Sequence, residues 1–315
     1  MAGEASFEVR PDLTAIAVMH RNEEYIADSV APRALVGSQL YEYTEFTIED
    51  SYNMPNDAVG RTAKPNVYEF SSQLKTGQCR DYALDTPIPN RDIENARNIP
   101  NFNPMGVATE QLMDLIALNR EKRLADVVFN ANTYATDQKV QLASNDQFSD
   151  FTNSDPIGVI TDGLSKMLRR ANVMVLGREV ADKLQLHPQI IQAVYGKSTA
   201  TSSIVPLEAI AALFGLKEVK VGDAWYNTAK KGQTASFSRI WGKHVSLFYR
   251  GTATPNMIAP GVTFMLTAQF GDRFAGVIPD HYMGARGGQM VRAGESVDEK
   301  VISNLAGYFI EDAVA

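Results

Sequence analysis

Histidines are the residues whose chemistry is easiest to look for, because closely spaced pairs of them hold zinc or act as acid–base groups. The chain of 315 residues has four histidines, and none forms an HExxH or HxxxH pair with another: His20, His187, His244 and His281. Their spacing predicts no metal site. The single cysteine, Cys79, has no second cysteine for a disulfide or a CxxC motif. We expect it to be a small apolar residue in a strand.

Two stretches could bind phosphate, and each lacks part of its motif. GARGGQ, Gly284–Gln289, has no GxxxxGK spacing and is typical of a turn between strands. VMVLGREV, Val173–Val180, has the strand–Gly–helix form of a nucleotide-binding crossover, but with a single glycine. No GxSxG nucleophile elbow occurs in the sequence. The sequence therefore predicts no catalytic residue and no cofactor, which favours a structural role.

The composition excludes several classes of protein. The apolar fraction of 44% and the aromatic fraction of 9% are those of a folded protein. With 37 acidic and 30 basic residues, no global field draws the chain onto nucleic acid, so a specific DNA reader is not expected. The N-terminus, MAGEASFEVRPD, has no secretory signal. The most apolar window, IVPLEAIAALFGL, is broken by Pro206 and Glu208 and is shorter than the ~20 residues of a membrane span. We expect a reducing, aqueous compartment and no membrane.

The elements that would position functional residues include one long helix, over about residues 106–130. Its apolar residues recur at helical spacing: Val107, Leu112, Leu115, Ile116, Leu124, Val127 and Val128. Its charged residues fall on other faces: Glu110, Asp114, Arg120 and Arg123. At 1.5 Å per residue such a helix is ~36 Å long. A rod of that length is able to brace a thin, wide domain.

Two strands are predicted before this helix, over 40–48 and 67–74, because apolar and polar residues alternate there. About eighteen residues rich in Asn, Asp, Gly and Pro separate them, among them Arg61 and Lys64. This is long for a hairpin loop in a compact domain, and such a loop usually has a function or a partner. The first thirty residues are predicted to form an arm, extended up to Leu13, with a short helix from Asn22 that ends before Pro32.

An α/β unit is predicted from residue 151. Asp155 is placed to cap a helix and Pro156 to take its first position. The strand NVMVLG, the helices REVADKLQL and PLEAIAALFG, and the strand LKEVKVG then alternate. Further strands follow at ASFSRIWG, HVSLFYR and VTFMLTAQF. The last strand, in EKVISNLAGYFIEDAV, is expected to pair far away in sequence, near the long helix.

The order of these segments resembles a known family. The segments follow one another as in the major capsid proteins of tailed bacteriophages, which have the Hong Kong 97-type fold. In order, they are EYIADSVAPRALVG, the strand pair with its loop, RDYALDTPIPNRDIENA, RLADVVFNANTY, NDQFSDFTNSDPI, FGLKEVKVGDAWYNTAKKGQTASFSRIWGKHVSLFY and DEKVISNLAGYFIEDAV. The resemblance covers nearly the whole chain, and its order of segments carries it rather than a single motif.

The resemblance implies an α+β fold in four parts. They are an N-terminal arm, 1–35; an extended two-stranded loop, 36–80; a peripheral domain with the long spine helix, 81–150 and 262–315; and an α/β axial domain, 151–261. It also implies a structural protein that is not an enzyme. Some members carry an N-terminal scaffolding segment that is later removed, so this chain is expected either to be processed or to use a separate scaffolding protein.

The implied mechanism is self-assembly. Contacts between unlike faces of identical chains close into rings, and rings of five and six tile an icosahedral or prolate shell around double-stranded DNA. Copies of the chain are therefore the expected partners, with scaffolding, portal and cement or decoration proteins, and the DNA is enclosed without sequence-specific binding. Assembly is expected in the bacterial host cytoplasm and the product in the virion. The residues expected at subunit contacts are Arg61, Lys64, Tyr68, Phe70, Glu110, Asp114, Arg120 and Arg123.

Three other functions stay open from the sequence. The nearest is an encapsulin-like nanocompartment shell of the same fold. An α/β enzyme built on residues 151–222 would have a pocket with convergent polar groups at the strand ends. A phage tail or decoration protein would form tubes or trimers.

Overall fold

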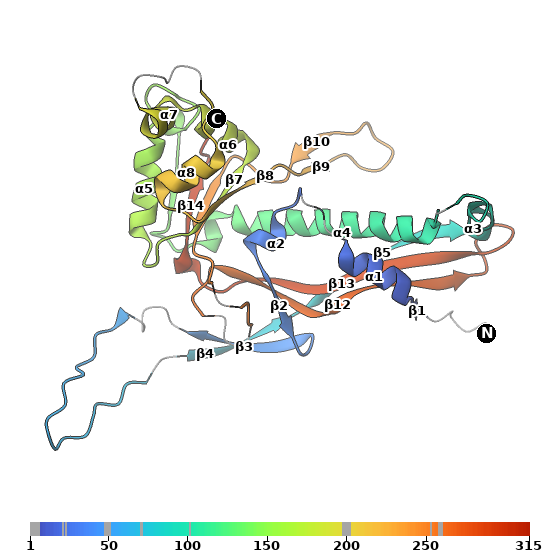
Figure 1. Ribbon diagram of the computed structural model, residues 1–315, viewed down its shortest axis with the longest axis horizontal. Coiled ribbons are helices and arrows are strands. Elements are labelled where there is room, and N and C mark those ends of the chain that lie inside the picture. The colour runs from blue at the N-terminus through green and yellow to red at the C-terminus, as the bar shows by residue number, and fades with distance from the viewer. Residues whose placement is uncertain are drawn as a thin grey trace.

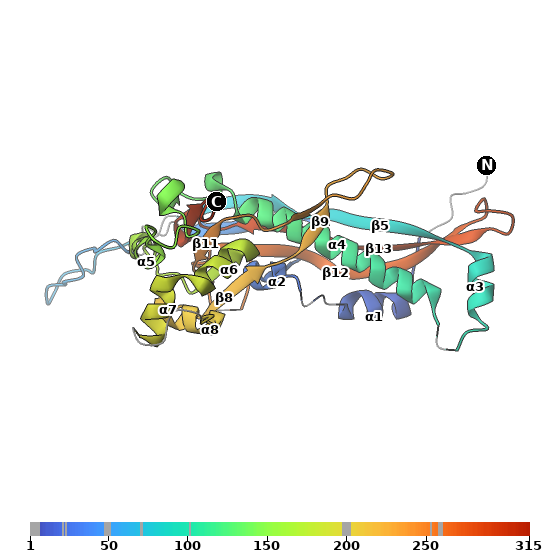
Figure 2. The same cartoon turned by 90° about the horizontal axis from the view of Figure 1, so that it is seen from above.

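The computed structural model describes residues 7–20, 22, 24–46, 52–69, 72–100, 102–196, 203–252, 254–257 and 261–315. An α/β unit lies at one end, and a long sheet with a helix lying along it extends from that unit (Figure 1). Seen from above, this second part is thin and elongated (Figure 2).

The long helix predicted from the sequence is confirmed as α4, Pro104–Val128. Asn103 caps it, since its side chain accepts a hydrogen bond from the Met105 amide, and proline takes the first position. The helix packs on a sheet of β5 (Arg80–Pro89), β13 (Gly288–Val301) and β12 (Met265–Asp280). The far edge of β12 pairs with β1 (Glu8–Val9) and, in parallel, with β2 (Arg33–Val36). Leu112, Met113 and Ile116 are buried between α4 and this sheet.

GARGGQ forms the predicted turn, which joins β12 to β13. Gly284 and Gly287 both have positive φ there, 59° and 70°, a conformation that favours glycine. The two strands are antiparallel, with a register shift between Phe270 and Phe274.

The α/β unit holds a five-stranded sheet in the order β6-β14-β11-β7-β8. Its strands are β6 (Lys139–Gln141), β7 (Val173–Gly177), β8 (Glu218–Gly222), β11 (Val245–Phe248) and β14 (Gly307–Glu311). Its helices are α5 (Pro156–Lys166), α6 (Arg178–Leu186), α7 (Pro188–Tyr195) and α8 (Leu207–Phe214). The predicted Asp155 cap is confirmed, because its Oδ1 accepts from the Gly158 amide at 2.9 Å. Gly215 ends α8 with φ 67°, as expected.

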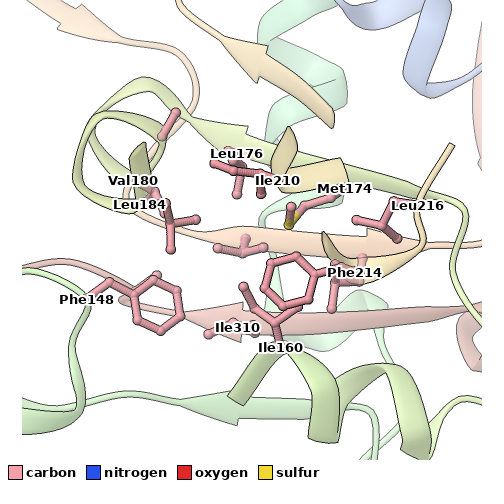
Figure 3. Close-up of a cluster of buried hydrophobic side chains, with 14 of the residues drawn as sticks. Phe148, Ile160, Met174, Leu176, Val180, Leu184, Ile210, Phe214, Leu216 and Ile310 are labelled. Carbon is pink, nitrogen blue, oxygen red and sulfur yellow. The ribbon is translucent and has the colours of Figure 1, made fainter. Parts of the chain in front are cut away.

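The core of this unit lies between the sheet and its helices (Figure 3). Ile160 of α5, Met174 of β7, Phe214 of α8 and Ile310 of β14 meet there, and each is almost fully buried. Residues far apart in the sequence, such as Ile160 and Ile310, therefore share one core.

The last strand pairs far away in sequence, as expected, since β14 lies between β11 and β6 inside the α/β sheet. Its Phe309 is buried in one cluster with Leu124 and Val128, so the strand also lies beside the end of the long helix. The division of the chain into four domains stays a prediction, but residues 307–311 and 139–141 pair with strands of the 151–261 segment.

The arm differs from the expectation. A helix that the sequence did not predict, α1 (Pro11–Met19), packs on α4 and β12 through Leu13 and Ala17. The helix expected from Asn22 is the short α2, Ala27–Val30, and it does end before Pro32.

Two hairpins project from the body (Figure 1). β3 (Leu40–Phe46) pairs with β4 (Ser72–Gln78), so the second strand begins later than the predicted 67–74. β9 (Trp225–Asn227) pairs with β10 (Phe237–Arg239). Further elements are α3 (Asn90–Ala96) and the short 3₁₀ turns Ala131–Thr133, Ser144–Asp146 and Asn304–Ala306.

Candidate subunit-contact surfaces

Residues 52–69 lie between β3 and β4, within the predicted two-stranded region 36–80, and from here on we call only these residues the extended loop. This loop reaches away from the rest of the molecule (Figure 1). Every one of its residues is exposed, including Arg61, Lys64 and Tyr68. Met54 and Val67 are the most exposed apolar residues in it, at 97% and 87%. The predicted contact residue Phe70 lies outside the described residues.

Hydrogen bonds across the extended loop hold its two sides together. The Asn66 side-chain amide donates to the Asn56 carbonyl at 2.8 Å, and that of Asn53 donates to the Tyr68 hydroxyl at 2.8 Å. At the base, the Tyr52 hydroxyl donates to the Leu168 carbonyl at 3.0 Å. The loop thus has polar ties and no apolar core of its own.

The charged residues predicted on α4 divide into two groups. Glu110 is exposed, and so are Val107 and Leu115 on neighbouring turns. These three residues form what we call the open face of α4.

Asp114 and Arg123 have partners within their own chain. Asp114 Oδ1 lies 2.9 Å from His20 Nε2 and accepts from the Asn22 side chain at 3.2 Å. The Arg123 guanidinium donates to Glu299 at 2.9 Å and stacks on the Tyr82 ring, 3.7 Å from its centroid. Both side chains tie α4 to its own subunit.

Arg120 is 3% exposed, so in this conformation it is not available to a neighbouring subunit. Its guanidinium pairs with Asp28 and donates to the Thr267 hydroxyl at 3.1 Å. Next to it, Arg33 donates to Asp28 at 2.7 Å and to Glu295 at 2.8 Å, and Arg273 lies 3.3 Å from Glu295. This charge network binds the arm to α4, β12 and β13.

The network keeps its carboxylates ionised. Asp28 is 59% exposed at its side chain; the atoms around it still oppose its ionisation, but Arg120 and Arg33 lower its pKa to about 2. Burial likewise opposes ionisation of Glu295, and the guanidinium groups of Arg33, Arg120 and Arg273 hold its pKa below the ordinary value. Paired in this way, the buried charges of Glu295 and Arg120 are tolerated.

Glu121 was not singled out by the sequence, yet it is fully buried. Its carboxylate accepts from the backbone amides of Ile26 at 3.1 Å and Ala27 at 2.8 Å, and from Trp241 Nε1 at 2.6 Å. Burial raises its pKa, against the opposing effect of these hydrogen bonds. One side chain of α4 therefore holds both the arm and the segment after β10. No local pattern in the sequence marks it, since all three donors are about 95 to 120 residues away.

Ser154 and His187 are a nucleophile and a base within hydrogen-bond distance, 3.0 Å. His187 Nδ1 accepts from the Gln189 amide, so the proton of the neutral ring is on Nε2 and points at Ser154. The Ser154 hydroxyl donates to the Asp150 carbonyl at 2.6 Å. His187 thus donates to the serine instead of accepting its proton, and the pair serves to cap α7.

Within the described ranges, no cluster of three or more His, Cys, Asp or Glu side chains could hold a metal ion. Among the helices of these ranges, none is long and apolar enough to cross a membrane. Cys79 is buried, and burial raises the pKa of its thiol to about 11. Two hollows, of about 580 and 700 Å³, are lined by residues of the arm, α4, β5, β12 and β13, outside 151–222.

Comparison with known proteins gives a consistent result. No family model matches the chain. The major capsid protein of Pseudomonas phage JBD67 is 43% identical to it over 311 residues, which is 99% of each chain. Among solved structures, a phage-related protein from Bordetella bronchiseptica RB50 has a TM-score of 0.75 at 21% identity, covering 98% of each chain. The capsid structure of cyanophage P-SCSP1u has a TM-score of 0.57 at 8% identity, covering 99% of this chain and 91% of that one. The predicted α+β fold of the Hong Kong 97 type is confirmed.

Proposed function

This chain belongs to the phage major capsid proteins, and from that premise we propose that its copies assemble through rings of five and six into a closed shell around double-stranded DNA. The family makes the protein a structural component of the virion shell that associates with itself. The copies would meet through the extended loop of one subunit and α4 of the next.

The extended loop is the observation that carries the proposal. It has no core in its own subunit, and it exposes Met54, Val59 and Val67 together with Arg61 and Lys64. Apolar residues without a cover in the subunit are typical of an interface that forms on assembly. In a ring of identical chains, the loop of each copy would lie across the next copy and gain its core there.

The open face of α4 is the surface that we propose receives this loop. Glu110 offers a negative charge to Arg61 or Lys64, and Val107 and Leu115 offer apolar surface to Val59 and Val67. Charge complementarity of this kind selects orientation and partner more than it adds affinity.

The remaining partners belong to the same proposal. Scaffolding and portal proteins would be separate chains, assembly would take place in the bacterial host cytoplasm, and a cement or decoration protein would bind the outer face. DNA would be enclosed without sequence-specific contacts, since acidic residues outnumber basic ones, 37 to 30.

The first test is electron microscopy of the protein purified from a co-expressing lysate, with hydrogen exchange on free subunits and on particles. We expect closed shells, and slower exchange of residues 52–69 in the shells than in free subunits. DNA inside distinguishes a virion shell from a protein nanocompartment. A small oligomer that no lysate or scaffolding protein converts into shells contradicts the proposal.

Variants test the loop contact. Arg61→Glu with Lys64→Glu should lower the fraction of protein in particles, because both charges would oppose Glu110, while the matched control Arg61→Lys with Lys64→Arg should assemble normally. Adding Glu110→Lys to the double variant should restore assembly in part. Normal assembly of the double variant at low salt would count against this contact.

A further inference from the structure

The hairpin of β9 and β10 has one uncovered aromatic face. Trp225 is opposite Arg239, and Asn227 is opposite Phe237. Residues opposite each other in an antiparallel pair point to the same side of the ribbon, so Trp225, Phe237 and Arg239 share a face. Trp225 is 49% and Phe237 is 65% exposed. We call this the aromatic face of the hairpin.

The other side of the same ribbon is turned towards its own subunit. Tyr226 alternates with Trp225 along β9, and Lys122 Nζ of α4 lies 5.5 Å from the centroid of its ring. On the aromatic face, the Arg239 guanidinium stacks on Trp225 at 4.3 Å. The hairpin is thus held by α4 on one side, and it leaves large aromatic groups open on the other. Tryptophan and arginine are enriched among the residues that dominate binding at interfaces.

The turn of the hairpin is basic. Residues 225–242 contain Lys230, Lys231 and Arg239 and no acidic residue, and Arg239 is paired with Asp223 just before β9, so the two lysines carry the net charge. Lys230 and Lys231 lie where the chain turns between the strands, and Lys231 is exposed. A partner surface of the opposite sign is therefore favoured. The extended loop has Asp57 and Glu69 against Arg61 and Lys64, so it offers no net negative charge.

A surface of the opposite sign lies on the other flank of the α/β unit. Residues 142–166, which include all of α5, contain Asp146, Asp150, Asp155 and Asp162 against one lysine, Lys166, at the end of the helix. Asp162 and the neighbouring Thr161 are exposed on α5. In both views α5 lies at the left of the α/β unit, while the hairpin extends to the right (Figures 1 and 2).

We infer that the aromatic face of the hairpin docks on α5 of the next copy in a ring. This rests on the proposed assembly into rings, in which one flank of each copy meets the opposite flank of its neighbour. The hairpin and α5 are on opposite flanks, so they are unable to meet within one chain. The lysines of the hairpin turn and the excess of aspartate along 142–166 suit the two surfaces to meet between chains. Lys230 and Lys231 then face Asp162, and Trp225 and Phe237 lose their contact with water.

Engineered cysteines test the contact in assembled particles. Phe237→Cys combined with Thr161→Cys should, on oxidation, link chains into a ladder that ends at five or six in a non-reducing denaturing gel. The native Cys79 is buried and does not interfere. Phe237→Cys combined with Tyr282→Cys, on the exposed turn after β12, is the matched control and should stay unlinked.

Charge exchange gives a second readout that needs no cysteine. Lys230→Glu with Lys231→Glu should lower the fraction of chain in particles at low salt, and Asp162→Lys in the same chain should restore it. Unchanged assembly of the Lys230→Glu, Lys231→Glu variant at low salt overturns the docking.

The other possible results also decide whether the hairpin docks on α5. Normal particles without a ladder overturn the docking and leave the proposed shell standing. Linked dimers from Phe237→Cys alone would show that two hairpins meet. A ladder with Val59→Cys in place of Thr161→Cys would show that the extended loop covers the aromatic face. Either result overturns the assignment to α5. If the unmodified chain forms no particles under any condition, the proposed function fails, and the docking fails with it.

Discussion

Glu121 is the residue whose replacement should cost most, because three donors converge on it. Glu121→Ala leaves the Ile26 and Ala27 amides and Trp241 Nε1 buried without a partner. We expect the free energy of unfolding of the isolated subunit to fall by about 3 kcal/mol or more, whereas Glu121→Gln, which keeps one acceptor oxygen, should cost less. Denaturant unfolding of both variants measures this. Equal losses would show that the charge, not the hydrogen bonding, matters.

His187 should make stability depend on pH. Burial lowers the pKa of its ring, with Asp155 partly opposing, so the unfolded chain binds a proton at higher pH than the folded one. The free energy of unfolding should therefore decrease as pH falls from about 6.5, the ordinary histidine pKa, through the lower folded value. His187→Asn keeps an acceptor for the Gln189 amide and does not titrate, so it should weaken this dependence. His244, whose pKa is also lowered by burial, accounts for a remaining slope of the same sign.

At the scale of the element, α4 should tolerate changes on one side only. Leu124 is fully buried, and Leu124→Ala should destabilise the subunit by about 2–5 kcal/mol through the cavity that it leaves. Leu115→Ala, on the open face of the same helix, should have little effect on the isolated subunit. Thermal unfolding compares the two. If both variants lose the same stability, the helix does not lie as described.

Local signals explain which elements the sequence predicts. α4, α5 and the β7–α6 and α8–β8 pairs have caps, periods or runs of apolar residues within the element itself. α1 was missed because it buries only Leu13 and Ala17, which is too little for a period. The start of β4 was placed too early because alternation does not show where the partner strand ends. The partner of a strand and the register of its pairing depend on residues far away in the sequence.

The same limit explains the candidate contact residues. A charge on an amphipathic helix is expected in solvent. Arg120 and Glu121 are buried because their partners, at Asp28, Thr267 and Trp241, are about 90 to 150 residues away. Arg61, Lys64 and Glu110 are exposed, as expected for charged residues in a loop or on the outer side of a helix.

At the scale of the whole molecule, the α/β unit depends on both ends of its half of the chain. β14 pairs with β11, and β6 pairs with β14; both β14 and β6 come from outside the 151–261 segment. A fragment of residues 151–261 should therefore expose the edge of β11 and part of the core around Ile310, and we expect it to be insoluble or without cooperative unfolding. A fragment of 139–261 joined by a linker to 307–315 should fold cooperatively. A cooperative transition in the shorter fragment would contradict this.

The extended loop has a consequence for the kinetics of assembly. In the proposed ring each copy would give one loop and receive one, so an open row of subunits would always have one loop unused, while a closed ring would have none. Closure adds that last contact at the effective concentration of neighbours already held in place, far above the concentration of free subunits. Incomplete rings should therefore be short-lived, and assembly should begin sharply above a threshold concentration of subunits.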